Sequence, residues 1–394
     1  YIMTAITGLR GTGQFTTDFR PTNYRELFTL LEPNGTAPLQ ALLSMAGSES
    51  TDDPKYNHFR DELPDRTLTV DGAIASAATG AVVVDNDDDE AFVVAGTVLQ
   101  NQATGEIMHA TADANLGTNT LTVTRNIGGT THQIGDGDVL VIAGFADQEG
   151  GSSPTAISFD PTLDHNFTQI FKTAVQVSGT LQNTYLRTGD KEQEQLTKAL
   201  KLHMGDIERA MFFGQRHEAN GSTASPTRYT GGLQSMITNV TDGASFGASA
   251  NVITEKEFDR LLIEDIFAYG ASEKVAFCGS RVISNLMEIG KNRWQPTQID
   301  NAYGVSLTRY TTYAGDLLVY MHPMFRQTGM DQEMFVLDMA ELKYRYMQGR
   351  DTQLVRDIQT PDFDGVKHMY MTECGLEMTQ AKVHHRIKGW TAVA

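Results

Sequence analysis

The longest helical pattern of the chain lies in its middle, in GDKEQEQLTKALKLHMGDIERAMFFGQ, residues 189–215. The side chains at helical spacing are Leu196, Leu200, His203 or Met204, Ile207, Ala210 and Met211. This stripe predicts one amphipathic helix of roughly 24 residues, about 36 Å long. Asp190 is the expected N-cap, with Gln193 as in a capping box, and Gly214 is the expected C-terminal stop. Gly205 predicts a bend or a close neighbour, because glycine costs about 1 kcal/mol relative to alanine in a helix.

The most distinct block of the sequence is residues 71–150, where short strand candidates alternate with turn sequences such as NLGTN and GDGD. Regular short strands of this kind predict a small all-β sandwich or barrel. The block contains twelve acidic residues and one basic residue, so it carries −11 of the chain's net charge of −18. A block this acidic must be well solvated, and we expect that it does not face phosphate.

Composition excludes several classes of protein. The chain has 394 residues, with 31 Lys and Arg against 49 Asp and Glu, which argues against a dedicated nucleic-acid binder but not against local DNA contact. Cys278 and Cys374 are too few for a disulfide framework or a four-cysteine zinc site, and predict buried free thiols. No apolar run approaches the ~20 residues that span a bilayer, so we expect a soluble protein without a membrane partner.

The remaining segments differ in pattern. Residues 1–50 have too little periodicity for a core and predict an arm, with short helices at 27–31 and 39–45. Residues 54–70 and 164–181 predict strands on either side of the acidic block. An α/β segment follows at 228–330, including a helix with Thr254 as N-cap and Glu257 three residues later. Strands return after it, which makes the expected fold class α+β.

Candidate catalytic and metal-binding motifs are weak. DNDDDE at 85–90 lacks the spacing and helices of an EF-hand, and predicts a solvated acidic loop. GDGD at 135–138 is a single copy of a calcium-binding repeat, so a β-turn is the better interpretation. His384 and His385 are adjacent in a predicted strand and would point to opposite faces. HExxH, GxSxG and Walker motifs are absent from the sequence. We therefore expect a structural protein, with no catalytic residues, cofactor or metal.

The order of these parts resembles the major capsid proteins of tailed bacteriophages, which have the Hong Kong 97-type capsid fold. The stretches that carry the resemblance are TLTVTRNIGGTT, GDGDVLVIAGFADQEG, FTQIFKTAVQVSGTL, RTGD and DIERAMFFG. The resemblance implies an N-terminal arm, an extended loop with the β block inserted, a peripheral domain with the long helix as its spine, and an axial domain. The implied boundaries are 1–53 for the arm, 54–181 for the loop with 71–150 inserted, 182–227 and 331–394 for the peripheral domain, and 228–330 for the axial domain.

The same resemblance implies the function. Copies of the chain would form hexamers and pentamers of an icosahedral shell around packaged double-stranded DNA, with expansion of a procapsid. The expected partners are the chain itself and DNA held non-specifically on the inner face, with scaffolding, portal and decoration proteins as further candidates. The expected location is the virion capsid, assembled in the cytoplasm of a host bacterium. Lys55 and Lys172 are the lysines on the presumed loop, and we interpret them as solvated and not as cross-linking residues. The alternatives are an encapsulin-like compartment shell and, in another class, a carbohydrate-binding or hydrolytic enzyme.

Overall fold

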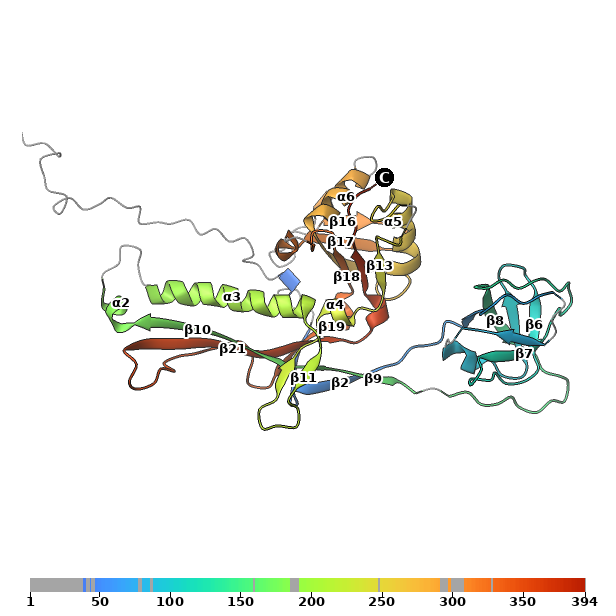
Figure 1. Ribbon diagram of the computed structural model, residues 1–394, viewed down its shortest axis with the longest axis horizontal. Helices are drawn as coiled ribbons and strands as arrows, with labels where there is room; N and C mark the ends of the chain where they lie inside the picture. Colours follow the sequence, from blue (N-terminus) through green and yellow to red (C-terminus); the bar gives the residue numbers. More distant parts are fainter. Residues whose placement is uncertain are drawn as a thin grey trace, which may run out of the picture. The chain divides into compact units, whose positions relative to one another are not determined.

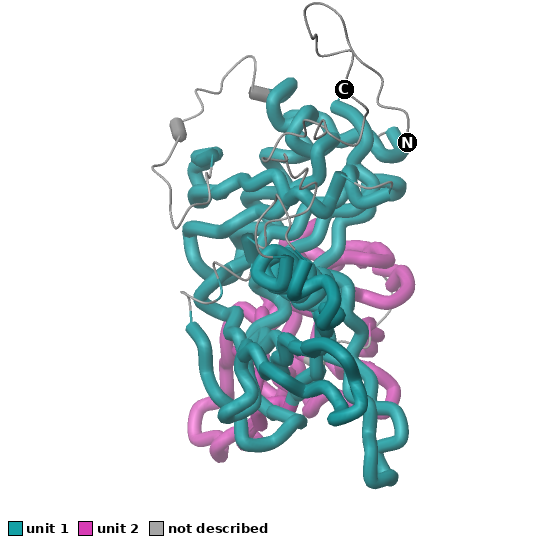
Figure 2. The backbone as a smooth tube through the Cα atoms, turned by 90° about the vertical axis from the view of Figure 1, so that its left-hand side faces the viewer, with its two compact units in different colours: residues 1–58, 164–394 teal, residues 59–163 magenta. Residues whose placement is uncertain are grey.

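The computed structural model describes residues 38–39, 43, 47–76, 80–85, 88–158, 160–184, 191–246, 249–290, 297–298, 308–326 and 329–393. The chain divides into two compact units (Figure 2). The first, called the frame unit below, comprises Tyr1–His58 and Asp164–Ala394. The second, called the barrel unit, comprises Phe59–Leu163 and so extends beyond the predicted 71–150 block on both sides. β2 (Lys55–Arg60) and β9 (Thr162–Phe167) pair where the chain passes from one unit to the other and back.

One sheet of the frame unit supports the long helix (Figure 1). Its strand order is β1 (Ser48–Thr51), β19 (Leu342–Met347), β21 (Gly365–Met378) and β10 (Gln169–Ser178), with β20 (Gln353–Val355) also paired to β21. β10 and β21 are antiparallel over the full length of β10. Phe171, Val175 and Val177 of β10 are buried. Their spacing of two residues or a multiple of two puts them on one face of the sheet.

α3 (Lys191–Phe213) is a single helix of 23 residues that packs on β10 and β21. At 1.5 Å per residue it is about 35 Å long. The apolar side chains that it buries are Leu196, Ala199, Ile207, Met211 and Phe212. The predicted helix is therefore present, with its stripe against the sheet. The short helix α2 (Gly179–Asn183) precedes it and has Ser178 as N-cap.

The second sheet of the frame unit has seven strands and is mixed. Its order is β13 (Val240–Asp242), β22 (His385–Lys388), β18 (Met334–Leu337), β14 (Glu273–Cys278), β17 (Asp316–Met321), β16 (Thr308–Thr311) and β15 (Thr297–Gln298). Its central strands are buried on both faces, because alternate side chains enter two different cores. Val275 and Phe277 of β14 pack into a core shared with α3 and the first sheet. Ala276 and Cys278 pack into a core on the opposite face.

The frame unit also contains short helices and helical turns. They are α4 (Leu233–Met236), α5 (Glu255–Leu261), the π-helical turn η4 (Leu262–Ile266), α6 (Ser280–Gly290) and the 3₁₀ turns η5 (Pro323–Arg326), η6 (Met339–Glu341) and η7 (Ala381–Val383). The capping box predicted for α5 is confirmed. Glu257 N donates to the Thr254 hydroxyl at 3.2 Å, and Thr254 N donates to the Glu257 carboxylate at 2.9 Å. β11 (His217–Ala219) and β12 (Thr227–Tyr229) form a separate two-stranded hairpin.

The barrel unit contains a six-stranded sheet that closes on itself. The strand order is β3 (Thr67–Thr69), β8 (Val139–Phe145), β5 (Thr97–Asn101), β6 (Ile107–Ala110), β7 (Thr120–Thr124) and β4 (Ala81–Val83). A β-bridge between Val70 and Val84 joins the two end strands. Asp71 N donates to Val83 O, and Asp85 N donates to Thr69 O, beside this bridge. Closure removes the free sheet edges, and apolar side chains fill the interior.

Two details of this unit differ from the sequence prediction. β3 precedes the predicted block: the sequence assigned 54–70 to a strand outside the block, whereas β3 pairs with β8 inside the barrel unit. The stretch AFVVAGTVL is not one strand. Its beginning belongs to the 3₁₀ turn η3 (Asp88–Phe92), and β5 begins only at Thr97.

Two of the glycines singled out in the sequence predict opposite effects of substitution by alanine. At Gly214 a Cβ would lie 2.4 Å from the carbonyl oxygens of both Ala210 and Thr230. Gly214→Ala must displace backbone, and we expect it to lower the free energy of unfolding by at least about 1–3 kcal/mol. At Gly205 the nearest described atom to a Cβ would be Arg209 Nη1, at 3.8 Å. Gly205→Ala should therefore raise the free energy of unfolding by up to about 1 kcal/mol.

Chemical denaturation of the unassembled protein, followed by circular dichroism, measures both effects. The two variants add the same methyl group at the same helix, so each controls for the other. Equal stability of the two variants would contradict the backbone contact assigned to Gly214.

Candidate functional site

Chemically reactive groups are few in the described part of the frame and barrel units. No three His, Cys, Asp or Glu side chains of the described residues are grouped as ligands of one metal ion. Both cysteines are buried, and burial raises the pKa of the Cys374 thiol to about 12 and raises that of Cys278 as well. No described helix is both long and apolar enough to cross a membrane. The sites described next are therefore those that hold the frame unit together and those that it exposes.

The three predicted site residues of α3 have different environments. Asp190 lies outside the described residues. α3 continues through Gly205, which is buried, and the described atom nearest to a Cβ added there would be Arg209 Nη1, at 3.8 Å. The expectation that α3 bends there between two shell states stays a prediction. Gly214 directly follows the helix, but its φ is not positive. Glycine is required there because a Cβ would lie 2.4 Å from the carbonyl oxygens of Ala210 and Thr230. Gly232 N also donates to Gly214 O at 2.9 Å.

Two buried polar side chains tie α3 to its surroundings. His203 is fully buried, with Nδ1 3.0 Å from the Thr173 hydroxyl and Nε2 2.8 Å from the Thr372 hydroxyl, so it joins the helix to β10 and β21. Glu208 is also fully buried, and its Oε1 lies 2.9 Å from His322 Nε2. The histidine on the predicted stripe is therefore a packing residue.

Glu208 also fixes the described part of the N-terminal segment. Its Oε1 accepts a hydrogen bond of 2.8 Å from the backbone N–H of Leu39. The side chains of Leu39 and Leu43 are fully buried in the core that contains α3. Leu39 and Leu43 are thus part of the frame unit's core.

The base of the β2–β9 ribbon is bonded to β21 at one point. The Tyr56 hydroxyl donates to Leu376 O at 2.9 Å, and burial raises the pKa of this phenol well above its usual value. The side-chain amide of Asn166, on β9, donates to Leu376 O at 2.7 Å and to Gly231 O at 3.1 Å. Its carbonyl oxygen accepts from Gly231 N at 2.8 Å. Asn166 is fully buried. It joins β9 of the ribbon to β21 and to Gly231, in the segment that follows β12.

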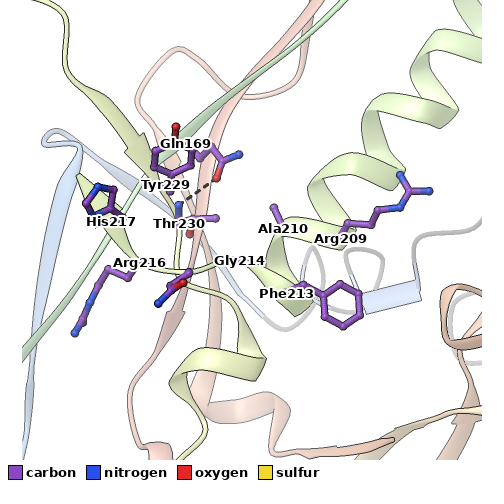
Figure 3. Close-up of a pocket in the computed structure, with 10 residues that line it drawn as sticks. Gln169, Arg209, Ala210, Phe213, Gly214, Arg216, His217, Tyr229 and Thr230 are labelled. Carbon is purple, nitrogen blue, oxygen red and sulfur yellow. Dashed lines mark hydrogen bonds between the residues drawn. The ribbon is translucent and has the colours of Figure 1, made fainter. Parts of the chain in front are cut away.

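A pocket of about 740 Å³ opens beside that hairpin, at the end of α3 (Figure 3). Its lining residues are Gln169, Arg209, Ala210, Phe213, Gly214, Gln215, Arg216, His217, Tyr229 and Thr230. The lining contains two arginines and no acidic residue. The rings of His217 and Tyr229 are stacked, with centroids 6.1 Å apart. The pocket is therefore lined by aromatic rings and by two arginines, which are paired with Asp206 and Asp164.

The turn, the acidic loop and the two lysines that the sequence analysis singled out are described next. In GDGD, Asp138 N donates to Gly135 O at 3.3 Å and Gly137 has a φ of 79°, which confirms the β-turn. In the acidic loop, Asp89 accepts from Arg66 N at 3.1 Å, and residues 86 and 87 lie outside the described residues. Lys55 and Lys172 are both exposed.

The rings of His384 and His385 have different hydrogen-bond partners and are not arranged to bind one metal ion together. His384 Nδ1 accepts from Asp338 N at 3.1 Å, whereas His385 Nε2 lies 2.7 Å from the Thr241 hydroxyl. The other ring nitrogen of each has no hydrogen-bond partner among the described residues. Burial lowers the pKa of both rings to about 4.

Sequence reasoning missed Glu208, Tyr56 and Asn166. Glu208 carried a signal, because it lies next to Ile207 and three residues before Met211, inside the apolar stripe of the helix. Tyr56 and Asn166 carried none, since their partners are backbone groups far away in the sequence.

Comparison with known proteins adds independent findings. The family described as the SU10 major capsid protein matches residues 10–391. The major capsid protein of Pseudomonas phage PaMx41 is 27% identical over 333 residues, which is 82% of this chain and 78% of that protein. Among solved structures, the capsid of a native GTA particle has a TM-score of 0.47 at 10% identity, covering 97% of this chain and 98% of that one. The capsid of Myoviridae phage XM1 has a TM-score of 0.45 at 10% identity, covering 98% and 100%.

Asn166→Ala should loosen the base of the ribbon. The change leaves the N–H and carbonyl groups of Gly231 without their buried partner, and a buried unsatisfied group costs about 1–3 kcal/mol. We expect a lower free energy of unfolding and faster hydrogen exchange in 162–167 and 229–232. Asn183→Ala, which removes an exposed amide in α2, is the matched control and should change neither. Unchanged exchange in the first variant would contradict the role given to Asn166.

Acid should destabilise the frame unit through His384 and His385. The pKa of each is about 4 in the folded state against about 6.5 in an unfolded chain, so the unfolded state takes up protons first as the pH falls. The stabilisation is complete above about pH 6.5 and is lost towards pH 4, by up to about 3 kcal/mol for each ring. Chemical denaturation at a series of pH values measures this loss.

The double variant His384→Gln, His385→Gln should show a flatter dependence of stability on pH in this window. His217→Gln, at an exposed histidine, should keep the dependence of the natural chain. A double variant with the natural dependence would show that other groups cause the loss.

Proposed function

Because this chain belongs to the SU10 major capsid protein family and is a structural protein of a phage capsid, we propose that it assembles into hexamers and pentamers of an icosahedral shell. The shell encloses packaged double-stranded DNA and forms first as a procapsid that expands. Assembly takes place in the cytoplasm of the host bacterium. Scaffolding, portal and decoration proteins are its further partners.

Each part of the chain has a proposed role in this shell. The β2–β9 ribbon belongs to the extended loop, and the barrel unit is a domain inserted in that loop. α3 and the five-stranded sheet form the core of the peripheral domain, with α3 as its spine. The seven-stranded sheet with α5 and α6 forms most of the axial domain. Residues before 38 form the arm.

The observation that carries the proposal is the family match across residues 10–391, and the electrostatics of the chain support it. The barrel unit contains sixteen acidic and three basic residues, a net charge of −13 out of −18. Packaged DNA repels such a unit, so the barrel unit belongs on the outer side of the shell. The two-stranded ribbon supports the proposal too, because a ribbon of two strands is marginally stable without a covering partner.

Expression of the chain, followed by sedimentation and negative-stain electron microscopy, tests self-assembly. We expect rings of five and six subunits and closed shells. Particles isolated from infected or induced cells should protect double-stranded DNA from nuclease. A compact monomer whose residues before 38 resist protease would contradict the proposal. Shells that hold a protein cargo and no nuclease-protected DNA would indicate a compartment shell in its place.

A further inference from the structure

The turn that joins β11 to β12 contains an asparagine followed by a glycine. Asn220 and Gly221 come directly after β11, and all residues from 220 to 225 are exposed. The other Asn–Gly pair of the sequence, at 34–35, lies outside the described residues. Asparagine is one of the thermolabile residues of proteins, because its side-chain amide can react with the main chain. The reaction depends on the residue that follows and on how firmly both residues are held.

The two groups that would react with each other are not held by hydrogen bonds. The side-chain amide of Asn220 and the N–H of Gly221 have no hydrogen-bond partner among the described residues. The bonds at this turn go to the main-chain oxygen of Asn220, which accepts from Thr223 N at 2.9 Å and from the Thr223 hydroxyl at 2.7 Å. The amide carbon of Asn220 and the nitrogen of Gly221 are therefore both open to reaction.

The backbone here can move into the geometry of attack. Asn220 has a left-handed φ of 57°, which asparagine tolerates in turns. The hairpin forms a sheet of its own, and two strands alone are marginally stable in water, so the turn can leave this conformation at low cost. Glycine at 221 has no side chain to cover its nitrogen. The nitrogen of Gly221 can thus meet Cγ of Asn220.

Asn126, in the barrel unit, shows what would prevent the same reaction. It is exposed and has a left-handed φ of 63°, as Asn220 does. However, its side-chain oxygen accepts from Gly129 N at 3.0 Å. The next nitrogen belongs to Ile127, donates to Ile107 O at 3.0 Å and is crowded by a β-branched side chain. Exposure and backbone conformation are therefore alike at the two asparagines, whereas the hydrogen bonds and the following residue differ.

We propose that Asn220–Gly221 is a site of spontaneous deamidation. The nitrogen of Gly221 loses its proton to a solvent base and bonds to Cγ of Asn220. The bond from Cγ to the side-chain nitrogen breaks, and this nitrogen takes a proton from solvent and leaves as ammonia. Water then adds to one of the two carbonyls of the resulting succinimide ring, and the bond from that carbonyl to the ring nitrogen breaks. The product is a carboxylate, either as aspartate or as isoaspartate, with water as the co-reactant and no transfer of electrons.

The product would change both the charge and the hydrogen bonds of the turn. Glu218 and Arg228 form an ion pair of 2.8 Å across the hairpin, and Oε2 of Glu218 lies 2.8 Å from where a Cβ on Gly221 would be. A new carboxylate at 220 adds a like charge close to Glu218, which is unfavourable. In isoaspartate the main-chain carbonyl that accepts from Thr223 becomes the free carboxylate. Deamidation therefore weakens the hairpin in which it occurs.

Peptide mapping by mass spectrometry of the purified full-length protein, aged in heavy-oxygen water, tests the proposal. We expect the peptide that contains residue 220 to exchange its amide for a carboxylate with one oxygen atom from solvent, faster in mildly alkaline than in neutral buffer. Part of the product should be isoaspartate, detected by enzymatic methylation. The peptide that contains Asn126 is the internal control and should stay unmodified over the same time. Equal rates at 220 and 126, or aspartate without isoaspartate, would overturn the inference.

Three variants test the role of the glycine. Gly221→Ala adds a Cβ that meets the flexible end of the Glu218 side chain, and it should slow the reaction at 220 at least about tenfold. Asn220→Gln should abolish it, because attack would have to close a larger ring. Ser222→Ala, at the next exposed position, is the matched control and should keep the natural rate. A natural rate in Gly221→Ala would contradict attack by this nitrogen. The reaction belongs to the single chain, so the outcome is independent of shell assembly.

Discussion

The frame unit depends on the packing of Phe212, near the end of α3. Its ring is in edge contact with Phe277 of β14, Phe325 of η5 and Phe335 of β18, with centroids 5.1–5.6 Å apart. Edge-to-face pairs of this kind each contribute about 0.5–1.5 kcal/mol beyond the apolar area that they bury. One side chain thus joins the helix to two strands of the second sheet and to η5. The long helix and the seven-stranded sheet are consequently one body and not two.

One turn before this ring, the buried Glu208 carboxylate joins α3 to two further segments by hydrogen bonds. It reaches His322 at the end of β17 and the backbone of Leu39. Burying a carboxylate lowers the stability of the fold unless its oxygens accept hydrogen bonds. The position of each hydrogen-bond donor is therefore strongly constrained. The rigidity of this centre contrasts with the β2–β9 ribbon and the β11–β12 hairpin, which have two strands each. In the proposed shell, the fixed body would carry these two-stranded elements to neighbouring copies, which would stabilise them.

The parts that could be predicted from the sequence are those with local causes. The helix 191–213 follows from the spacing of its apolar residues, and the start of α5 follows from Thr254 and Glu257, three residues apart. The turn at GDGD is equally local. The closure of the barrel through Val70 and Val84 could not be predicted, because it depends on register between strands that the sequence does not align. Glycine at 214 was expected as the C-terminal stop of the helix, whereas the structure also requires it because the carbonyl oxygen of Thr230, distant in the sequence, approaches so closely.

Lys274 shows most clearly what local reasoning leaves out. It lies in the apolar strand β14 and is 1% exposed. Its ammonium group donates to the carbonyl oxygens of Ile266, Tyr269 and Val383 at 2.6–2.7 Å. These oxygens belong to the end of the π-helical turn η4, the turn after it and η7. The sequence shows a lysine in a strand, but its three partners are backbone groups that only the folded chain brings together.

The barrel unit contains a buried ion pair between an arginine and a glutamate. Arg125, the one basic residue of its 71–150 block, is almost fully buried and forms a two-bond ion pair with Glu106, at 2.7 and 2.9 Å. Burial opposes ionisation of Glu106, but the bonds from Arg125 and from His132 N give its pKa a net downward shift. The only arginine of the block is therefore used inside the barrel, where it fixes the RNIGG loop to β6. Glu106 neutralises its positive charge inside the barrel, so the outer surface of the block is acidic. This acidic surface repels nucleic acid and other acidic surfaces.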